Sequence, residues 1–511
     1  MNIALLTALS QSIARSRHYK WWVYTAVAIG LFVTVMDQSG VNIALPKIAE
    51  DFDLDLPTVQ WITLSYVLST AAIFMPVGRL SDMVGRKRVY IIGSMIFAGA
   101  AAIGGTAQVF PVLIVAKVIQ GIGAAGIQAN SMAMIADVFP EQERGKALGL
   151  YSTIIGTGLI SGPIIGGLLV TGLGWRSVFF ANIPVGLISL AIALIVLVND
   201  APLEKGGPRR LKFDWVGAGL SSAALVSFLL GMSNGHRFGW GSPPVLASLL
   251  IGPFLLVVFL WWQLRTSDPM LDLSFFRNRV FSMGVSARFV QFLGNSSIFF
   301  MMPFYLIQVL GFSARKAGLI MVPGAVCLAI MGPISGRLSD KVGSRWLTVA
   351  GLAMSASAMF IFSRLSPDSS PTHVIIGLIL SGSGMGAFNS ANASAIIGSQ
   401  TRQDYGFISA FMNLTRTFAN VTGIALATTI VTVTMGSMGY EPSLAAVSGA
   451  GGEGVRAAFA SGLNKAFLAA GSFMLLALVI SGLNADARAT ETPAGEPLSQ
   501  PNPSPPPTGE D

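Results

Sequence analysis

The sequence predicts an all-α membrane protein with fourteen transmembrane helices, built as two six-helix bundles plus two inserted helices. The first observation is composition: 52% of the 511 residues are hydrophobic and only 11% are charged, whereas soluble proteins carry about 25% charged residues. The second is that apolar runs of about 20 residues, enough to span a bilayer, recur along the chain. The third is a repeat, because "GRLSDMVG" at Gly78 returns as "GRLSDKVG" at Gly336.

The apolar runs place the individual spans. Uninterrupted runs of this length favour helices over the alternating strands of a membrane barrel. The predicted spans, in chain order, are 21–45, 58–79, 89–109, 111–138, 147–171, 178–198, 215–233, 245–263, 281–310, 317–336, 346–364, 373–398, 406–435 and 466–484.

The repeat then divides the chain into domains. A shift of 258 residues aligns the first six spans with the last six and leaves spans 7 and 8 as an insertion, which is typical of transporters built from internal repeats. The predicted segments are an amphipathic segment on the membrane surface at 1–20, bundles at 21–200 and 281–484, a linker with two helices at 201–280, and a proline-rich, disordered tail at 485–511.

Basic residues predict the orientation. Of the 32 Lys and Arg residues, 21 fall in the alternate segments that include both chain ends and 8 in the opposite loops. This bias predicts that both termini are cytoplasmic. The net charge of +8 is therefore explained by a partner lipid bilayer, and we expect no nucleic-acid partner.

Several chemistries are excluded. One cysteine and three scattered histidines provide no disulfide and no metal site, and no nucleotide-binding loop of the Gly-x4-Gly-Lys type is present. The string "GMSNG" at Gly231 fits a hydrolase pattern but ends a membrane span, so we interpret it as chance. We expect no catalytic residues, no cofactor and no enzyme activity, and we expect an ion gradient as the energy source.

The repeated string predicts a gate. Gly78 and Gly85 permit close helix contact and a tight turn, while Asp82 and Arg86 are suited to charge-assisted bonds that form when helix ends meet. Asp137, at the same end of span 4, is the expected further partner of Arg86. The second copy supplies Asp340. The alternative is a basic turn that only fixes topology, but two copies at equivalent positions favour the gate.

Four ionisable residues lie within spans: Asp37, Lys117, Arg288 and Arg416. Such residues are costly in a membrane, which favours a functional role. Amides, hydroxyls and aromatic rings share their helix faces, and such polar stripes must face protein or water. The predicted substrate cavity adds to the two arginines Thr34, Gln38, Gln120, Gln128, Gln291, Phe292, Asn295, Phe299, Asn413 and Asn420.

Span 5 carries a glycine stripe. Gly158, Gly162 and Gly166 are four residues apart and form one helix face, which lets another helix approach closely. Pro163 is expected to bend the helix. The stripe is compatible both with a gate and with plain helix packing.

These motifs together resemble a known family. "GRLSDMVGRKR", "KVIQGIGAAG", "GLISGPIIGG", "MDQSGVNIALP", "WRSVFFANIPVG" and "FDWVGAGL" are similar, in this order, to motifs of the major facilitator superfamily, and specifically of its fourteen-span drug/proton antiporters. The resemblance implies the major facilitator fold, a gate at span 5 and a bacterial inner membrane. Two residues depart from the pattern: Lys117 stands where the fourth-span motif usually carries arginine, and Ser344 of the second copy stands where the first copy has Arg86.

The leading functional expectation is a proton-coupled exporter of lipophilic or cationic compounds that works as a monomer by alternating access. The alternative is an exporter of an endogenous lipid or anionic metabolite, because three buried cations face one buried acid. An ion channel does not need two repeated bundles. For proton coupling we predict Asp37, with Lys117 controlling its protonation. Both lie about 9–13 Å below the outer surface at about 1.5 Å per residue.

Overall fold

A computed structural model describes residues 16, 18–54, 56–59, 61–197, 213–440 and 453–483. Within this part, fourteen helices are long and apolar enough to cross a membrane, as predicted. Residues 1–15 of the predicted amphipathic segment, the predicted tail and the linker from 198 to 212 lie outside the described residues, whereas Tyr19 and Lys20 already belong to the first membrane helix.

The helices form two groups. The first group holds α2 (Tyr19–Asp51), α4 (Trp61–Val84), α5 (Arg86–Gly105), α6 (Phe110–Val138), α7 (Arg144–Leu173) and α8 (Arg176–Val196). The second holds α11 (Arg279–Phe304), α12 (Ala314–Val342), α13 (Arg345–Phe362), α14 (Pro371–Gly398), α15 (Tyr405–Ser437) and α17 (Glu453–Gly482). Short turns complete the chain: α3 (Leu56–Val59), η1 (Glu141–Glu143), η2 (Leu273–Arg277), the π-turn η3 (Tyr305–Val309) and η4 (Arg402–Asp404).

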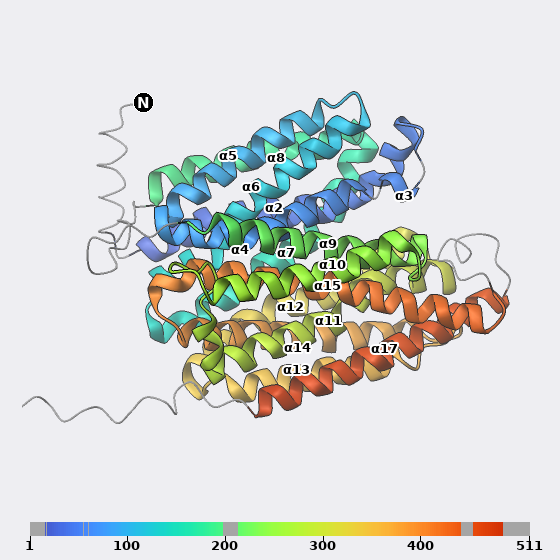
Figure 1. The fold of residues 1–511 in the computed structure, drawn as a ribbon. Coiled ribbons are helices and arrows are strands. Elements are labelled where there is room, and N and C mark those ends of the chain that lie inside the picture. The colour runs from blue at the N-terminus through green and yellow to red at the C-terminus, as the bar shows by residue number, and fades with distance from the viewer. Residues whose placement is uncertain are drawn as a thin grey trace, which may run out of the picture.

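The inserted helices α9 (Trp215–Phe238) and α10 (Pro243–Gln263) form a hairpin across the boundary between the two bundles (Figure 1). α9 packs on α4 of one bundle and α15 of the other. The hydroxyl of Ser222 donates to the carbonyl of Ala72 at 2.7 Å, and the rings of Phe228 and Phe418 lie 5.1 Å apart. Within the hairpin α10 is therefore the peripheral helix, whereas α9 contacts both bundles.

Local sequence explains where helices begin and end. The carboxylate of Asp214 accepts from the amide of Gly217 and caps α9, and Asn278 caps α11 in the same way. Gly85 and Gly343, equivalent residues of the repeated string, end α4 and α12 with φ angles of 100° and 89°. This left-handed conformation suits glycine. We call the side of the molecule that holds these two turns the repeat end.

The start of the last helix was predicted wrongly. The predicted span was 466–484, but α17 begins at Glu453. Arg456, Asn464 and Lys465 lower the hydropathy of its first turns, so an apolar run detects only the second half. Arg456 and Lys465 therefore belong to a helix rather than to a loop.

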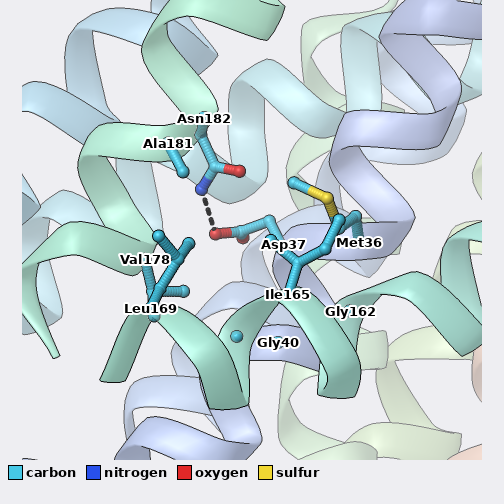
Figure 2. A pocket seen from close by; sticks show the side chains of 10 residues that line it. Met36, Asp37, Gly40, Gly162, Ile165, Leu169, Val178, Ala181 and Asn182 are labelled. Carbon is cyan, nitrogen blue, oxygen red and sulfur yellow. Dashed lines mark hydrogen bonds between the residues drawn. The ribbon is translucent and has the colours of Figure 1, made fainter. Parts of the chain in front are cut away.

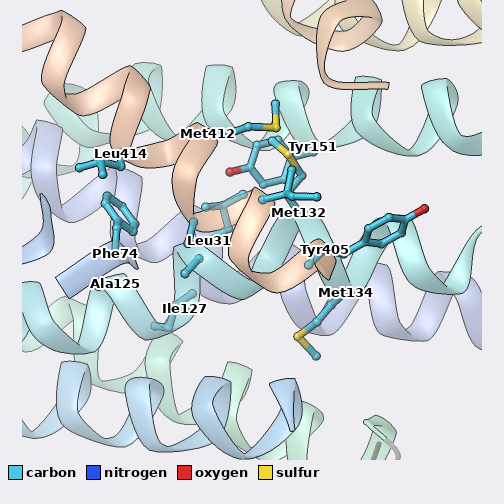
Figure 3. Close-up of a cluster of buried hydrophobic side chains, with 14 of the residues drawn as sticks. Leu31, Phe74, Ala125, Ile127, Met132, Met134, Tyr151, Tyr405, Met412 and Leu414 are labelled. Carbon is cyan, nitrogen blue, oxygen red and sulfur yellow. The ribbon is translucent and has the colours of Figure 1, made fainter. Parts of the chain in front are cut away.

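The two bundles share an apolar core that extends across their boundary. Buried side chains from α2, α4, α6, α7 and α15 form one apolar cluster (Figure 3). α7 and α12 approach closely through glycines, because a Cβ at Gly149 would meet the backbone of Gly332, and one at Gly145 that of Gly336. Apolar packing and glycine contacts thus hold the bundles together at the repeat end.

Candidate functional site

The predicted pair of Asp37 and Lys117 is confirmed as a contact. The ammonium of Lys117 (α6) lies 2.9 Å from Oδ2 and 3.1 Å from Oδ1 of Asp37 (α2). Both side chains are buried, with exposed fractions of 2% and 0%. The ammonium also lies over the ring of Phe179, 4.7 Å from its centroid.

Asn182 of α8 completes this arrangement, which we call the Asp37 cluster. Its Nδ2 donates to Oδ1 of Asp37 at 2.6 Å, and the residue has no exposed surface. Asn182 lies inside the motif "WRSVFFANIPVG", and its role was not predicted. The one sequence signal for it is a polar amide within an apolar span. All three members belong to the first bundle, so rocking of one bundle against the other does not by itself separate them.

A small crevice lies beside Asp37 and Asn182 (Figure 2). Its lining comes from α2, α7 and α8 and includes Gly40, Gly162 and Gly166. A Cβ at Gly166 would lie 2.9 Å from the carbonyl oxygen of Gly40. The glycine stripe of span 5 therefore packs on α2 of the same bundle, and α7 meets the other bundle through different residues. The helix continues through Pro163.

The first copy of the repeated string contacts the opposite bundle. Asp82, near the end of α4, accepts hydrogen bonds from the backbone amides of Gly406 at 3.1 Å and Phe407 at 2.7 Å. These amides lie in the first turn of α15, where a helix leaves its donors unpaired. A carboxylate there is further stabilised by the helix dipole.

Arg86 braces this contact. Its guanidinium lies 3.2 Å from Asp82 and 3.5 Å from Asp137, the predicted partner. It also donates to the carbonyl of Arg402 at 2.7 Å, in the turn before α15. Gly78 is required nearby, because a Cβ there would lie 3.2 Å from the carbonyl oxygen of Gly406.

The second copy of the repeated string lies in the second bundle and contacts a helix of the first bundle. Asp340, near the end of α12, accepts from the amides of Gly145 at 2.7 Å and Lys146 at 3.0 Å, in the first turn of α7. We call the Asp82 and Asp340 contacts the two carboxylate caps. Each joins one bundle to a helix of the other at the repeat end.

A third group, the central polar cluster, joins α6, α7, α11 and α15. A guanidinium nitrogen of Arg416 donates to Oε1 of Gln128 at 3.2 Å, and Nδ2 of Asn413 donates to the Gln128 carbonyl at 3.2 Å. The hydroxyl of Tyr151 lies 3.5 Å from Oδ1 of Asn413. Nε of Arg288 donates to the carbonyl of Met412 at 3.4 Å. The sequence missed Tyr151, because a tyrosine in an apolar span carries no distinct signal.

The other predicted cavity residues are distributed more widely. Thr34 bonds to its own helix, Gln38 is exposed, and Gln120 is buried with Nε2 unpartnered among the described residues. Asn295 accepts from Ser381 of α14 within the second bundle. Gln291 and Phe292 are buried in α11, Asn420 is half-buried in α15, and the side chain of Phe299 lies outside the described part.

Comparisons with known proteins agree with this architecture. The sequence model of the Major Facilitator Superfamily matches residues 27–424 and 284–503. The chain is 30% identical over 409 residues to a riboflavin transporter, RibZ, of Clostridioides difficile, covering 80% of this chain and 87% of RibZ. It is 30% identical over 422 residues to the multidrug resistance protein Stp of Mycobacterium tuberculosis, covering 82% and 77%.

A solved structure supports the same fold. The human organic anion transporter MFSD10 superimposes with a TM-score of 0.63 over 89% of this chain and 99% of that one. Its sequence is 17% identical, so this likeness concerns the fold alone.

Proposed function

Because this chain belongs to the Major Facilitator Superfamily and is a transporter rather than an enzyme, we propose that it is a proton-coupled exporter of lipophilic small molecules. The observation that carries the proposal is the buried Asp37 cluster, since an ionisable pair inside a membrane bundle is costly without a function. The relative Stp is named as a multidrug resistance protein, which supports export of small molecules from the cell.

In this proposal the repeat end faces the cytoplasm of a bacterium, with the protein in the inner membrane as a monomer. The basic-residue bias of the loops supports this orientation. The two carboxylate caps close the repeat end, so the structure corresponds to an outward-facing or occluded state. Opening towards the cytoplasm requires Asp82 and Asp340 to leave the amides of α15 and α7.

Asp37 is the proposed proton carrier. A charged Asp37 is held by Lys117 and Asn182, and a proton on Asp37 weakens both contacts. Because all three residues lie in one bundle, the proton acts by changing the packing of α2 against α6 and α8 rather than by rocking alone.

The decisive test uses purified Asp37→Asn in proteoliposomes. With only a pH difference as the driving force, the mutant is expected to lose uphill transport of a lipophilic fluorescent substrate while still exchanging it downhill. Asp53→Asn is the matched control, because Asp53 is an acid at the end of the molecule opposite the repeat end. Its backbone has a positive φ of 51°, which asparagine tolerates. Uphill transport by a correctly folded Asp37→Asn would contradict the proposal.

A cationic substrate class is less well supported than a lipophilic one. Asp37 is the one acid that the sequence places deep in a span, and Lys117 and Asn182 already occupy its carboxylate. A cation would have to displace Lys117. The arginines of the central polar cluster point to the alternative considered from the sequence, an anionic substrate.

A further inference from the structure

Two arginines meet at the boundary between the bundles without an acidic partner among the described residues. Arg288 of α11 is buried, with 3% of its surface exposed, and Arg416 of α15 bonds only to the neutral amide of Gln128. Arginine stays protonated even when buried. The central polar cluster therefore carries two positive charges, whereas Lys117 is neutralised by Asp37.

The hydrogen bonds of Arg288 are incomplete. A guanidinium has five donors, yet within the described ranges its one hydrogen-bond acceptor is the carbonyl of Met412, 3.4 Å from Nε. One terminal nitrogen, Nη1, is buried with no partner among the described residues. If Arg288 served only to hold α15, its terminal nitrogens would be expected to bond to α15 as a pair. A buried charge with unpaired donors is destabilising.

A second buried group nearby is also unpartnered. Gln291 lies three residues after Arg288, on the same face of α11. It has no exposed surface, and neither its amide oxygen nor its nitrogen has a partner in the described part of the chain. Fork-shaped guanidinium donors beside an amide donor match the two oxygens of a carboxylate.

Aromatic side chains lie next to these polar groups. The guanidinium of Arg288 lies 5.0 Å from the ring centroid of Phe292, and the rings of Phe289 and Phe418 are 5.9 Å apart across α11 and α15. Apolar rings around a few converging polar groups are typical of sites for small amphipathic molecules.

We propose that Arg288, Arg416 and Gln291 bind the acidic group of an amphipathic substrate, so that the exporter handles carboxylate-bearing lipophilic compounds. The substrate class rests on the proposed export function. Arg288 lies nine residues into α11, about 13 Å from the repeat end, and Asp37 lies 18 residues into α2, about 27 Å from it. The substrate's acid and the coupled proton therefore occupy separate sites.

The test uses three fluorescent probes that share one body: dansyl-aminoundecanoic acid, its methyl ester and a trimethylammonium counterpart. Binding is measured by fluorescence on the purified full-length protein without any gradient. The carboxylate is expected to bind about tenfold tighter than the ester, as charged hydrogen bonds imply. Equal binding of all three probes, or preference for the ammonium, would overturn the proposal.

Variants localise the effect. Arg288→Gln and Arg416→Gln are expected to abolish the preference for the carboxylate by weakening carboxylate binding much more than ester binding, and Arg288→Lys is expected to restore part of the preference. Arg265→Gln, which removes an arginine that lies over the ring of Trp261 in the inserted hairpin, is the control. Thermal melting confirms folding, and Gln291→Leu provides a second variant that keeps both charges. Retention of the carboxylate preference in both arginine variants overturns the assignment.

This binding assay is independent of proton coupling. If Asp37→Asn retained uphill transport while the carboxylate preference stood, the coupling proposal would fail and the anion site would remain. If the preference were absent while Asp37→Asn lost uphill transport, the anion site would fail and the exporter would remain.

Discussion

Asp82 and Asp340 occupy equivalent positions 258 residues apart, and each accepts backbone hydrogen bonds from the first turn of a helix in the opposite bundle. A short 3₁₀ turn precedes each capped helix, η1 before α7 and η4 before α15. The repeat in the sequence is therefore a repeat of contacts, and it ties the bundles together twice at one end.

Replacement of Asp82 by asparagine is expected to slow transport about 5–30-fold, the effect of losing about 1–2 kcal/mol of stabilisation of the closed repeat end. Asparagine keeps an acceptor for the amide of Phe407 but loses the charge that Arg86 and the helix dipole stabilise. Transport rates in proteoliposomes, normalised to inserted protein, measure it. A normal rate would show that the string only fixes topology.

The double variant Asp82→Asn/Asp340→Asn tests whether the two caps act on one equilibrium. Spin labels on α4 and α15 would report the distance between bundle ends at the repeat end. We expect each single change to shift the population towards the open end and the double change to shift it by nearly the sum of the two free energies, because the sites share no partner. An unchanged distance distribution in the double variant would argue against gating by the caps.

Glycine-to-alanine changes in α12 should separate close helix contact from helix propensity. A Cβ at Gly332 would lie 2.8 Å from the carbonyl oxygen of Gly149, whereas Gly318 has nothing within 4 Å. We expect Gly332→Ala to destabilise the closed repeat end and reduce transport, while Gly318→Ala is neutral or slightly stabilising. Equal effects would show that the α7–α12 approach is not needed.

Lys117→Gln is expected to reduce stability by about 3–5 kcal/mol, because it leaves the carboxylate of Asp37 buried without its cation. The double variant Asp37→Asn/Lys117→Gln removes both charges and is expected to recover most of the thermal stability without recovering uphill transport. Melting temperatures in detergent measure the first effect. A double variant that stays as unstable as Lys117→Gln would place the defect in packing rather than charge.

Thiol labelling should distinguish the two inserted helices. In a Cys327→Ala background, a cysteine at Val257 of α10, which is 65% exposed, is expected to be labelled without loss of transport. A cysteine at Ser222 of α9, which bonds to α4, is expected to impair transport when labelled. Inhibition at Val257 would contradict a peripheral position for α10.

The sequence predicted the fold and the charged contacts, because long apolar runs and charges inside them are strong signals. Arg86 with Asp137 follows from charge and a shared membrane end, and Asp37 with Lys117 follows from charge and depth once the family resemblance places spans 1 and 4 side by side. The partners of Asp82 and Asp340 did not, since backbone amides exist at every residue and only the tertiary structure selects those of Phe407 or Gly145.

Neutral partners were also beyond the sequence. Asn182 and Tyr151 acquire their contacts from helix packing, and neither lies in a polar stripe that periodicity would detect. The contact of the glycine stripe with α2 rather than with the other bundle depends on the rotation of α7, which the four-residue spacing does not fix.

The two lipid-facing flanks of the molecule differ, because α9 covers the seam between the bundles on one flank. α9 lies over the seam between α4 and α15, one helix from each bundle, whereas neither α9 nor α10 lies over the opposite seam between α7 and α12. A hydrophobic molecule that diffuses within the bilayer thus meets an inserted helix on one flank and, within the described part of the chain, no inserted helix on the other. Lateral access from the membrane is therefore expected on the α7–α12 flank, beyond the glycine contacts that close its repeat end.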